Sequence, residues 1–482
     1  MPISKATFVN KFVSELAESN AAVFVGAGLS KAAGYVDWPG LMAQLAEEIN
    51  LDAYKEADLV ALAQYYLNSK GNNRDQITRA LVSQFSDVHE PTESHKVLAR
   101  LPLKTIWTTN YDALLERALI TNGKRVDIKY TTEQLKTTKP GRDVTLYKMH
   151  GDVEHAHNAI LTRDDYERYY RTHEPFITAL SGALVSTTFC FLGFSFNDPN
   201  LQQILSHVRV FYGGNQRTHY CLTRRYREDL FKDKAEYEYA QTKQVLQAQD
   251  LLRFNIETVY VDEYSEVADV LADVERAYRV KTVFISGSAV EYGKWERPKT
   301  ESFLSELARR LVQKKFRITT GFGLGVGGPI VTGAVQAIYS QRDGSLDDAL
   351  VMRPFPIGIA DAADRRATFE RYREDIVSQA GIAIFILGNR VDSSGNVEVA
   401  SGVVDEFRLA QAKGLWVLPI GASGYAAKTI WDEVQAAFDK NYPGVDIETR
   451  ALIERLAGPV ADPSELLDPL VKVIEILAAR RG

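Results

Sequence analysis

Residues 23–30, with the sequence VFVGAGLS, decide the fold of the N-terminal half of the chain. The apolar run VFV predicts a buried strand, and Gly26, Ala27 and Gly28 follow it directly, where a helix can open. In α/β proteins, small residues at such a turn let backbone N–H groups approach a pyrophosphate. The full GxGxxG pattern is absent, so a tight packing turn accounts for the same glycines equally well.

Similar strand-like runs alternate with helical segments along nearly the whole chain, which predicts an α/β fold built on parallel sheets. An amphipathic helix with Phe8, Phe12 and Leu16 on one face opens the chain. In the first half, the expected strands are 22–25, 104–107, 144–147, 188–192, 219–222 and 257–261. In the second half they are 282–288, 316–319, 383–387 and 416–420.

The length of 482 residues suggests two or three domains at roughly 150 residues each. A helix expected over 265–278 ends near Arg279, and a new strand with a glycine turn begins at Thr282. We therefore expect a larger domain over residues 1–280 and a smaller one over 281–482. Residues 52–101 have helical periodicity without a strand, which predicts a helical insertion or lid over the first sheet.

The composition is that of a folded and slightly acidic protein. Hydrophobic residues make up 45% and charged residues 25%, and 57 Lys and Arg against 63 Asp and Glu give a net charge of −6. This balance excludes wholesale disorder and makes nucleic acid a poor default partner. Cys190 and Cys221 are too few for a four-cysteine zinc site, and both are expected as buried thiols.

The sequence also bears on a membrane location. The N-terminal segment lacks the apolar core of a signal peptide. The longest charge-free stretch, 318–341, is long enough to cross a bilayer, but its six glycines and Pro329 predict a loop followed by a helix. We therefore expect a cytoplasmic protein with no membrane partner.

Three further predicted strands end in polar segments: 108–112 (TTNYD), 148–152 (KMHGD) and 193–199 (GFSFNDP). Taken alone, the first is an ordinary turn, and a lone histidine such as His150 is more often structural. A histidine at a strand end can nevertheless reach a ligand hydroxyl and titrate near neutrality. Four strand ends of this kind in one domain favour a ligand site at the carboxyl edge of the sheet.

The segments GAGLS, TTNYD, MHGD and GFSFNDPN, in this order, resemble the NAD-binding signatures of the sirtuin (SIR2) fold over roughly residues 1–280. Residues 34–38 (GYVDW) occupy the place of the family's segment beside the nicotinamide. The resemblance implies a Rossmann-type sheet, with Asn110 holding the nicotinamide ribose and His150 acting as general base. The residues that it implies for NAD binding are Gly26, Ala27, Gly28, Ser30, Asp37, Asp112, Gly193 and Ser195.

Two departures from the sirtuin deacylases bear on the expected reaction. The four-cysteine zinc module that orders their peptide groove is missing, and Trp38-Pro39 replaces the aromatic–arginine pair expected after Asp37. Without a peptide groove, water is the simplest acceptor, so we expect an NAD glycohydrolase with NAD as its substrate. A protein deacylase or ADP-ribosyltransferase is one alternative, and a non-catalytic nucleotide sensor is another.

A cluster of possible metal ligands accompanies the segment 148–152. His150, His155 and His157 lie close in sequence to Asp152 and Glu154. The HAH spacing does not match a common zinc arrangement on a helix. We therefore expect no metal.

A second group of candidate residues lies in the C-terminal domain. A strand enters the turn Ser286-Gly287-Ser288, and a loop with Gly323 and Gly325 follows the next strand. Successive N–H groups in such a loop form an anion-binding nest. Four charged residues nearby are candidates for phosphate and ribose contacts, although each alone is an ordinary surface charge: Arg371, Arg373, Arg390 and Glu406.

Residues 282–482 resemble the SLOG domain, a Rossmann-like fold related to nucleotide hydrolases. The catalytic PGGxGTxxE signature is absent, with ASGVVDEF near its position, and this favours ligand sensing. A SIR2 domain followed by a SLOG domain resembles the effector NADase family of Thoeris antiphage defence, which acts by abortive infection in bacteria. The resemblance implies activation by a cyclic ADP-ribose isomer from a TIR-domain protein, and a homotetramer or larger assembly. Arg373 and Glu406 are the preferred contacts for this activator, with Arg371 as the alternative arginine.

Overall fold

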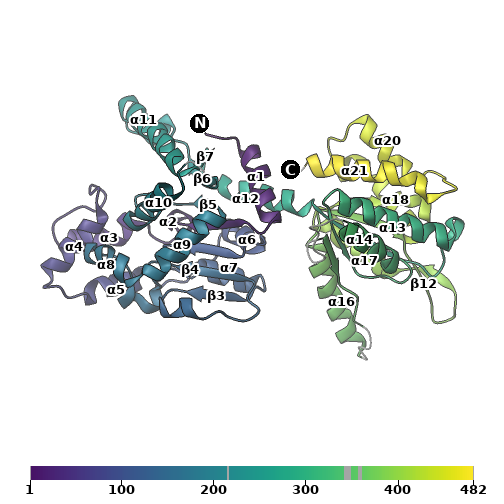
Figure 1. Ribbon diagram of the computed structural model, residues 1–482, viewed down its shortest axis with the longest axis horizontal. Helices are drawn as coiled ribbons and strands as arrows, with labels where there is room; N and C mark the ends of the chain where they lie inside the picture. The colour runs from purple at the N-terminus through teal and green to yellow at the C-terminus, as the bar shows by residue number, and fades with distance from the viewer. Residues whose placement is uncertain (1, 214–215, 341–348, 357–360, 481–482) are drawn as a thin grey trace. The chain divides into compact units, whose positions relative to one another are not determined.

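The computed structural model describes residues 2–213, 216–340, 349–356 and 361–480 (Figure 1). The chain divides into two compact units, of which the first ends at Glu275 and the second begins at Arg276. The division falls inside helix α12 (Glu266–Arg279), whereas the sequence placed it just after this helix. Gln341, the end of the charge-free stretch, lies outside the described residues.

The first unit is built on a parallel sheet of seven strands in the order β3-β4-β2-β1-β5-β6-β7. Strands β2, β3 and β4 lie on one side of β1, and strands β5, β6 and β7 lie on the other side. The order in which the chain adds strands therefore reverses beside β1. Cys190 and Cys221 on two of these strands are buried free thiols, as expected. The strands are β1 (Ala21–Val25), β2 (Thr105–Thr108), β3 (Val126–Lys129), β4 (Val144–Lys148), β5 (Thr188–Leu192), β6 (His219–Arg224) and β7 (Ile256–Val261).

Amphipathic helices pack against this sheet. The first begins after Ser4, whose side chain accepts a hydrogen bond from Thr7 N at 3.1 Å, and it buries Phe8, Phe12 and Leu16 as their spacing predicted. Besides α12, the helices of this unit are α1 (Lys5–Ala17), α2 (Ala27–Lys31), α3 (Trp38–Glu47), α4 (Leu59–Ser69), α5 (Asp75–Gln84), α6 (Glu93–Arg100), α7 (Leu114–Thr121), α8 (Arg163–Thr172), α9 (Glu174–Ser186), α10 (Pro199–Tyr212) and α11 (Lys234–Leu251).

The helical insertion expected over 52–101 is confirmed as helices, but it does not form one body. Helices α4 and α5 pack with α3 around a small core of their own, which includes Leu41, Tyr66 and Leu81 together with Tyr111 from the segment after β2. Helix α6 instead packs against α7. The alternative expectation, that this tract forms a lid over the first sheet, stays a prediction.

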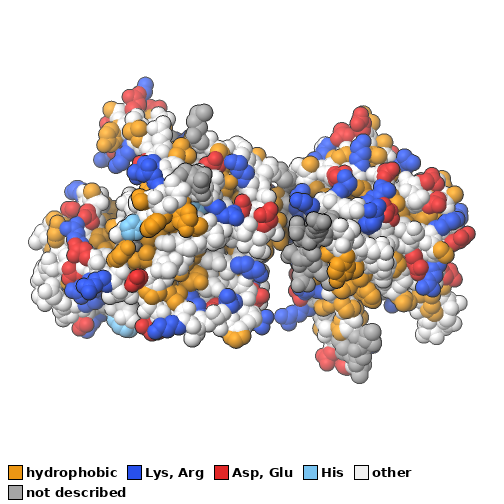
Figure 2. Space-filling view, viewed as in Figure 1, with side chains coloured by type: hydrophobic (Ala, Val, Ile, Leu, Met, Phe, Trp, Pro, Cys, Tyr) orange, Lys and Arg blue, Asp and Glu red, His pale blue; other side chains and the backbone are white. Residues whose placement is uncertain are grey.

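Helix α11 stands out from the body of the first unit (Figure 1). Gln244 is its buried residue, while Tyr239, Val245 and Leu246 are exposed. In the face shown in Figure 2, apolar and charged side chains of both signs mix along this helix. Among the described residues, none of the helices has both the length and the apolar character that crossing a bilayer requires.

The second unit contains a parallel five-stranded sheet in the order β10-β9-β8-β11-β14 and an antiparallel hairpin, β12–β13. Apolar side chains from both faces of the sheet form its core. The strands are β8 (Thr282–Ser288), β9 (Arg317–Thr320), β10 (Leu350–Met352), β11 (Ile382–Leu387), β12 (Asn389–Val391), β13 (Val397–Val399) and β14 (Trp416–Pro419). The helices are α13 (Arg297–Gln313), α14 (Gly327–Ser340), α16 (Ala362–Val377), α17 (Ser401–Ala412), α18 (Tyr425–Ala436), α19 (Phe438–Asn441), α20 (Ile447–Arg455) and α21 (Leu467–Arg480).

Candidate functional site

The four polar segments of the first unit meet at one edge of its sheet. They follow β4, β2, β1 and β5, which are neighbours in that order. Thr108 on β2 pairs with Lys148 on β4 and with Val25 on β1, and Val25 pairs in turn with Leu192 on β5. Asn110 and His150 therefore lie at matching depth, each two residues beyond a paired position, beside the point where the strand order reverses.

The glycines after β1 and β5 let two backbone turns pack directly on each other. Gly26 N donates to Leu192 O at 2.8 Å and Gly28 N to Gly193 O at 2.9 Å. A Cβ atom on Gly26 would lie 2.5 Å from Gly193 O, so a larger residue would separate the turns. Because both N–H groups already donate to backbone carbonyls of the protein, they favour the explanation of these glycines as a tight packing turn. A phosphate contact at this turn stays a prediction.

A buried polar cluster joins the turn after β1 to the segment after β2. Asn110 Nδ2 donates to Gly26 O at 3.0 Å and to Ser30 Oγ at 2.9 Å, and Ser30 Oγ donates to Asp112 Oδ2 at 2.7 Å. Asp112 Oδ1 also accepts from Leu114 N at 3.0 Å, at the start of α7. These bonds leave Asn110 Oδ1 buried and without a partner in the described part of the chain. An acceptor in that condition is suited to a hydroxyl or amide donor of a ligand.

His150 is 1% exposed and faces the same edge of the sheet. Neither of its ring nitrogens makes a hydrogen bond within the described residues. Burial lowers the pKa of His150, and the nearby charge of Asp198, whose Oδ2 lies 3.4 Å from Nε2, works against that effect. A neutral imidazole in this place can accept a proton.

A fully buried lysine holds the ends of β2 and β4 together. Lys148 Nζ donates to Asp112 O at 2.7 Å and forms ion pairs with Asp152 and, at 2.7 Å, with Glu116 on α7. Burial works to lower the pKa of Lys148, but the two carboxylates hold it above its ordinary value. The lysine thus fixes the backbone beside Asn110 and His150, a function that no pattern in the sequence indicates.

The second unit has a pocket of about 1240 Å³ at the carboxyl ends of β8 and β9, bordered by α16 and the start of α17. Its volume suits a nucleotide-sized ligand. Eight of the nine residues predicted for the activator line it: Ser286, Gly287, Ser288, Gly323, Arg371, Arg373, Arg390 and Glu406.

Glu406 is buried in this pocket, and Arg373 beside it is partly buried, with its side chain 15% exposed. The Arg373 guanidinium lies 3.3 Å from Asp405 and 3.8 Å from Glu406, and it stacks over Phe355 with 5.4 Å to the ring centroid. Ser286 Oγ donates to Glu406 Oε2 at 2.5 Å. Burial raises the pKa of Glu406 to about 7, against the opposing effects of Ser286 and Arg373. The pocket therefore combines arginines with a carboxyl group that titrates near neutrality.

Comparisons with known proteins agree with this arrangement. A family model described as a SIR2-like domain matches residues 104–246, and one described as the Sir2- and TIR-associating SLOG family matches residues 266–477. The relative named NAD(+) hydrolase ThsA from Bacillus cereus (strain MSX-D12) is 45% identical over 98% of this chain and 98% of its own length. The relative with that name from Acinetobacter baumannii (strain 532279) is 44% identical over 97% of this chain and 98% of its own length. The one from Cytobacillus dafuensis is 38% identical over 100% of this chain and 98% of its own length.

The chain belongs to the NAD(+) hydrolase ThsA family. The α/β fold and the order of a SIR2-like domain followed by a SLOG domain, both expected from the sequence, are confirmed. The names of these relatives give NAD(+) as the compound that they hydrolyse, which is the substrate expected from the sequence.

Three residues predicted for NAD binding in this ThsA family member, Asp37, Ser195 and Ala27, take no part in the hydrogen bonds among Asn110, Ser30 and Asp112. Asp37 caps α3 by accepting from Gly40 N at 3.1 Å, and its other oxygen pairs with Lys31 at 2.6 Å. Ser195 is exposed, and Ala27 is the first residue of α2. Their contacts with a ligand stay predictions.

In the second unit, Gly325 does not line the pocket with the other predicted residues. It has a local reason to be glycine, because its φ is +71° and a Cβ atom there would lie 2.4 Å from Ala289 O. Arg390 pairs with Glu398 across the β12–β13 hairpin at 2.7 Å. Arg371 is exposed on α16. It lines the same pocket as Arg373, the other candidate arginine.

Sequence reasoning missed several residues of both sites. Arg365, Arg366 and Arg408 also line the pocket. The spacing of Arg366, Phe369 and Arg373 on α16 would have placed them on one helical face. In the first unit, Asp198 belongs to the polar segment after β5 but was assigned no function there.

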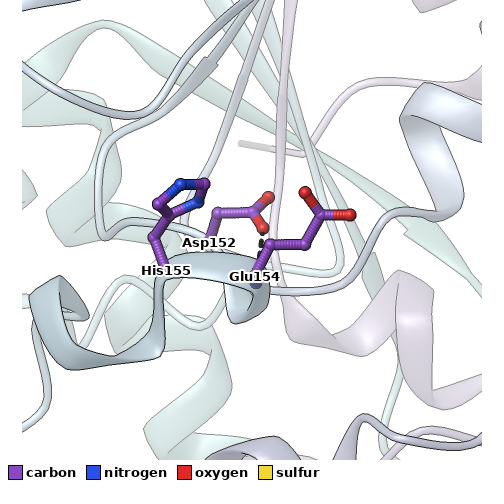
Figure 3. Close-up of side chains that lie close together, drawn as sticks. All are labelled: Asp152, Glu154 and His155. Carbon is purple, nitrogen blue, oxygen red and sulfur yellow. Dashed lines mark hydrogen bonds between the residues drawn. The ribbon is translucent and has the colours of Figure 1, made fainter.

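The structure brings Asp152, Glu154 and His155 together in the segment after β4 (Figure 3). We assign no metal to them. One oxygen of Asp152 pairs with Lys148, and the other accepts from Glu154 N at 2.8 Å, as the dashed line in Figure 3 shows. Both oxygens of the Asp152 carboxylate thus already have partners within the protein, and these contacts stabilise the turn.

Proposed function

We propose that this chain hydrolyses NAD⁺ to nicotinamide and ADP-ribose at the carboxyl ends of β4, β2, β1 and β5. The observation that carries the proposal is that two buried groups, Asn110 Oδ1 and the His150 imidazole, make no hydrogen bond within the described residues and lie on neighbouring strand ends of a ThsA family member. Both groups are fixed by surrounding elements, as positioning of a reactive ligand requires.

The proposed reaction breaks the bond between the nicotinamide nitrogen and C1′ of its ribose. The bonding electron pair leaves with nicotinamide, C1′ passes through a cation-like state, and a water oxygen bonds to C1′. Asn110 Oδ1 orients the ribose and the attacking water, and Asp112 binds the nicotinamide amide. His150 accepts the proton that the water loses and passes it to solvent, because burial favours the neutral form of the free imidazole.

We further propose that the pocket of the second unit binds a cyclic ADP-ribose isomer, which activates the first unit. Arg373, held over Phe355, would contact a phosphate, and Glu406 would contact a ribose hydroxyl. The activator must bind the active arrangement more tightly than the idle one, since equal affinity would shift nothing. A hundredfold difference corresponds to about 2.7 kcal/mol of coupling.

The biological setting follows from the family resemblance. We propose that the chain depletes NAD⁺ in the bacterial cytoplasm during antiphage defence, leading to abortive infection. A TIR-domain protein would make the activator, and the chain would work as a homotetramer or larger assembly. Light scattering of the purified chain tests the assembly, because a monomer at working concentration with full activity contradicts it.

The two sites can be tested separately with purified variants and nicotinamide release as the readout. Asn110→Ala and His150→Ala should lose turnover, whereas His207→Ala, at an exposed histidine on α10, should retain it. Turnover near the wild-type level in both site variants would refute the site. Use of NAD⁺ only with an acyl peptide or protein acceptor would replace hydrolysis with the deacylase or transferase reaction.

The pocket needs its own variants, with a panel of cyclic ADP-ribose isomers as probes. Arg373→Ala should abolish activation but leave unactivated turnover unchanged. Arg297→Ala, at a surface arginine paired with Glu301 on α13, is the matched control. Full activation of the Arg373 variant would contradict the assignment, and loss in Arg371→Ala instead would move the contact to that residue.

A further inference from the structure

Asp198 lies where the fold brings the start of α10 against the segment after β4. Its Oδ2 is 3.4 Å from His150 Nε2 and accepts a hydrogen bond from Tyr166 OH at 3.2 Å. Its Oδ1 accepts from Leu201 N at 2.8 Å and so caps α10. The carboxylate is therefore held on both oxygens, with its side chain 9% exposed, and its Oδ2 lies within ion-pair distance of the imidazole without forming a hydrogen bond to it.

The other groups around the imidazole offer it no opposite charge. Tyr166 and Tyr169 on α8 meet the ring edge-on, with centroids 5.4 and 6.0 Å away. Tyr169 OH donates to Met149 O at 2.9 Å, and its ring stacks on His173, which follows α8. His150 acts on His173 as a like charge, which helps to lower the pKa of His173. Among the described residues that face His150, Asp198 is thus the anion.

We infer that Asp198 is a positioning residue for His150, an inference that rests on the proposed hydrolysis. The neutral ring carries its proton on Nε2, toward Asp198, and this leaves Nδ1 as the acceptor. In the reaction, the water that bonds to C1′ gives its proton to Nδ1, while the electron pair of the broken C1′–N bond leaves with nicotinamide. The carboxylate then stabilises the imidazolium until the proton passes to solvent.

Asp198→Asn separates this function from the helix cap. Asparagine caps helices as well as aspartate does, so the bond from Leu201 N and the start of α10 are retained. The amide removes the charge and can donate to Nε2, which moves the ring proton to Nδ1 and blocks the acceptor. A purely structural aspartate would tolerate this exchange.

The first experiment measures NAD⁺ turnover of the full chain against pH, with the activating cyclic ADP-ribose isomer at saturation. Asp198→Asn should lower kcat about 10²-fold with KM changed less than about threefold. Its acidic limb should move to lower pH, because loss of the carboxylate removes the charge that favours the imidazolium. The matched control is Asp233→Asn, at the N-cap of α11, where Asp233 accepts from Glu236 N at 2.8 Å and no histidine is involved. Wild-type kcat and an unmoved acidic limb in the Asp198 variant would overturn the inference.

A second measurement does not depend on turnover. Nitrogen NMR of the chain labelled at its eight histidines gives the tautomer and pKa of each ring, and His150→Gln identifies the resonances of His150. The inference predicts a proton on Nε2 in the wild type and a lower pKa of His150 in Asp198→Asn. A proton on Nδ1 in the wild type, or an unchanged pKa, would overturn it. If NAD⁺ is not hydrolysed but the NMR results hold, the proposed function fails while the His150–Asp198 pairing stands.

Discussion

Gly193→Ala tests the close packing of the two turns on which the site of the first unit is built. Gly193 has φ of +62°, and a Cβ atom there would lie 2.5 Å from Leu29 N and 2.9 Å from Gly28 C. The left-handed backbone costs a non-glycine residue about 1–2 kcal/mol. Forcing two backbone turns apart adds about 1–3 kcal/mol, as overpacking does elsewhere. The total loss of about 2–5 kcal/mol should be accompanied by loss of NAD⁺ hydrolysis, because the turn after β1 carries the bonds to Asn110.

Gly123→Ala is the matched control, since Gly123 has φ of +77° with nothing within 4 Å of a Cβ atom. The free energy of unfolding of Gly123→Ala should fall only by the backbone cost of about 1–2 kcal/mol, and the variant should retain activity. Calorimetry of the full chain compares the two variants, and at roughly 2–4 °C per kcal/mol Gly193→Ala should melt at least about 2 °C below the control. Both glycines lie in the first unit, so the same transition shifts. Equal melting temperatures and equal activities of the two variants would contradict the close packing of Gly193 against the turn after β1.

Three further predictions concern buried charges. Lys148→Met should lower the free energy of unfolding by about 3–5 kcal/mol in urea titrations, because it leaves Glu116 and Asp152 without their partner. Adding Glu116→Gln should recover part of this loss, and no recovery would contradict the ion pair with Glu116 as a cause. Burial lowers the pKa of His95 and of His219 to about 4, so below the ordinary value of 6.5 the unfolded chain binds protons that the folded chain does not. Stability should therefore fall as the pH drops from about 6.5 to 4, and a smaller fall in His219→Gln checks the cause. Because the pKa of Glu406 is about 7, anionic cyclic ADP-ribose isomers should bind more tightly below pH 7 than above it in titration calorimetry. Glu406→Gln should remove this pH dependence, and an unchanged pH dependence in that variant would contradict Glu406 as its cause.

The strands were predictable from sequence wherever apolar residues run without interruption. The run preceding Gly26 is such a case, and β1 is indeed fully buried. Strand β3 was missed because Asp127 and Lys129 interrupt its pattern, although they neutralise each other at 2.9 Å and are buried. A charge pair inside a strand thus hides it from a hydrophobicity pattern. The three-residue strands β10, β12 and β13 are too short to leave a periodic pattern.

Part of the candidate site followed from chain order alone. Parallel strands place their carboxyl ends at one edge, so Asn110 and His150 could be brought together without coordinates. Asp198 could not be assigned, because an aspartate before a proline at a helix start already has a local explanation as a cap. Its second contact depends on how α10 packs beside the segment after β4, which no local pattern contains. The same holds for Lys148, whose partner Glu116 lies on another element.

The decisive experiment measures nicotinamide release from NAD⁺ by the purified full chain, with and without each cyclic ADP-ribose isomer. We expect low turnover by the chain alone and a steep rise with one isomer, without any acyl peptide present. Turnover that no isomer changes would contradict the gating by the pocket of the second unit. No hydrolysis of NAD⁺ under any of these conditions would contradict the proposed NAD⁺ hydrolysis at the sheet edge of the first unit.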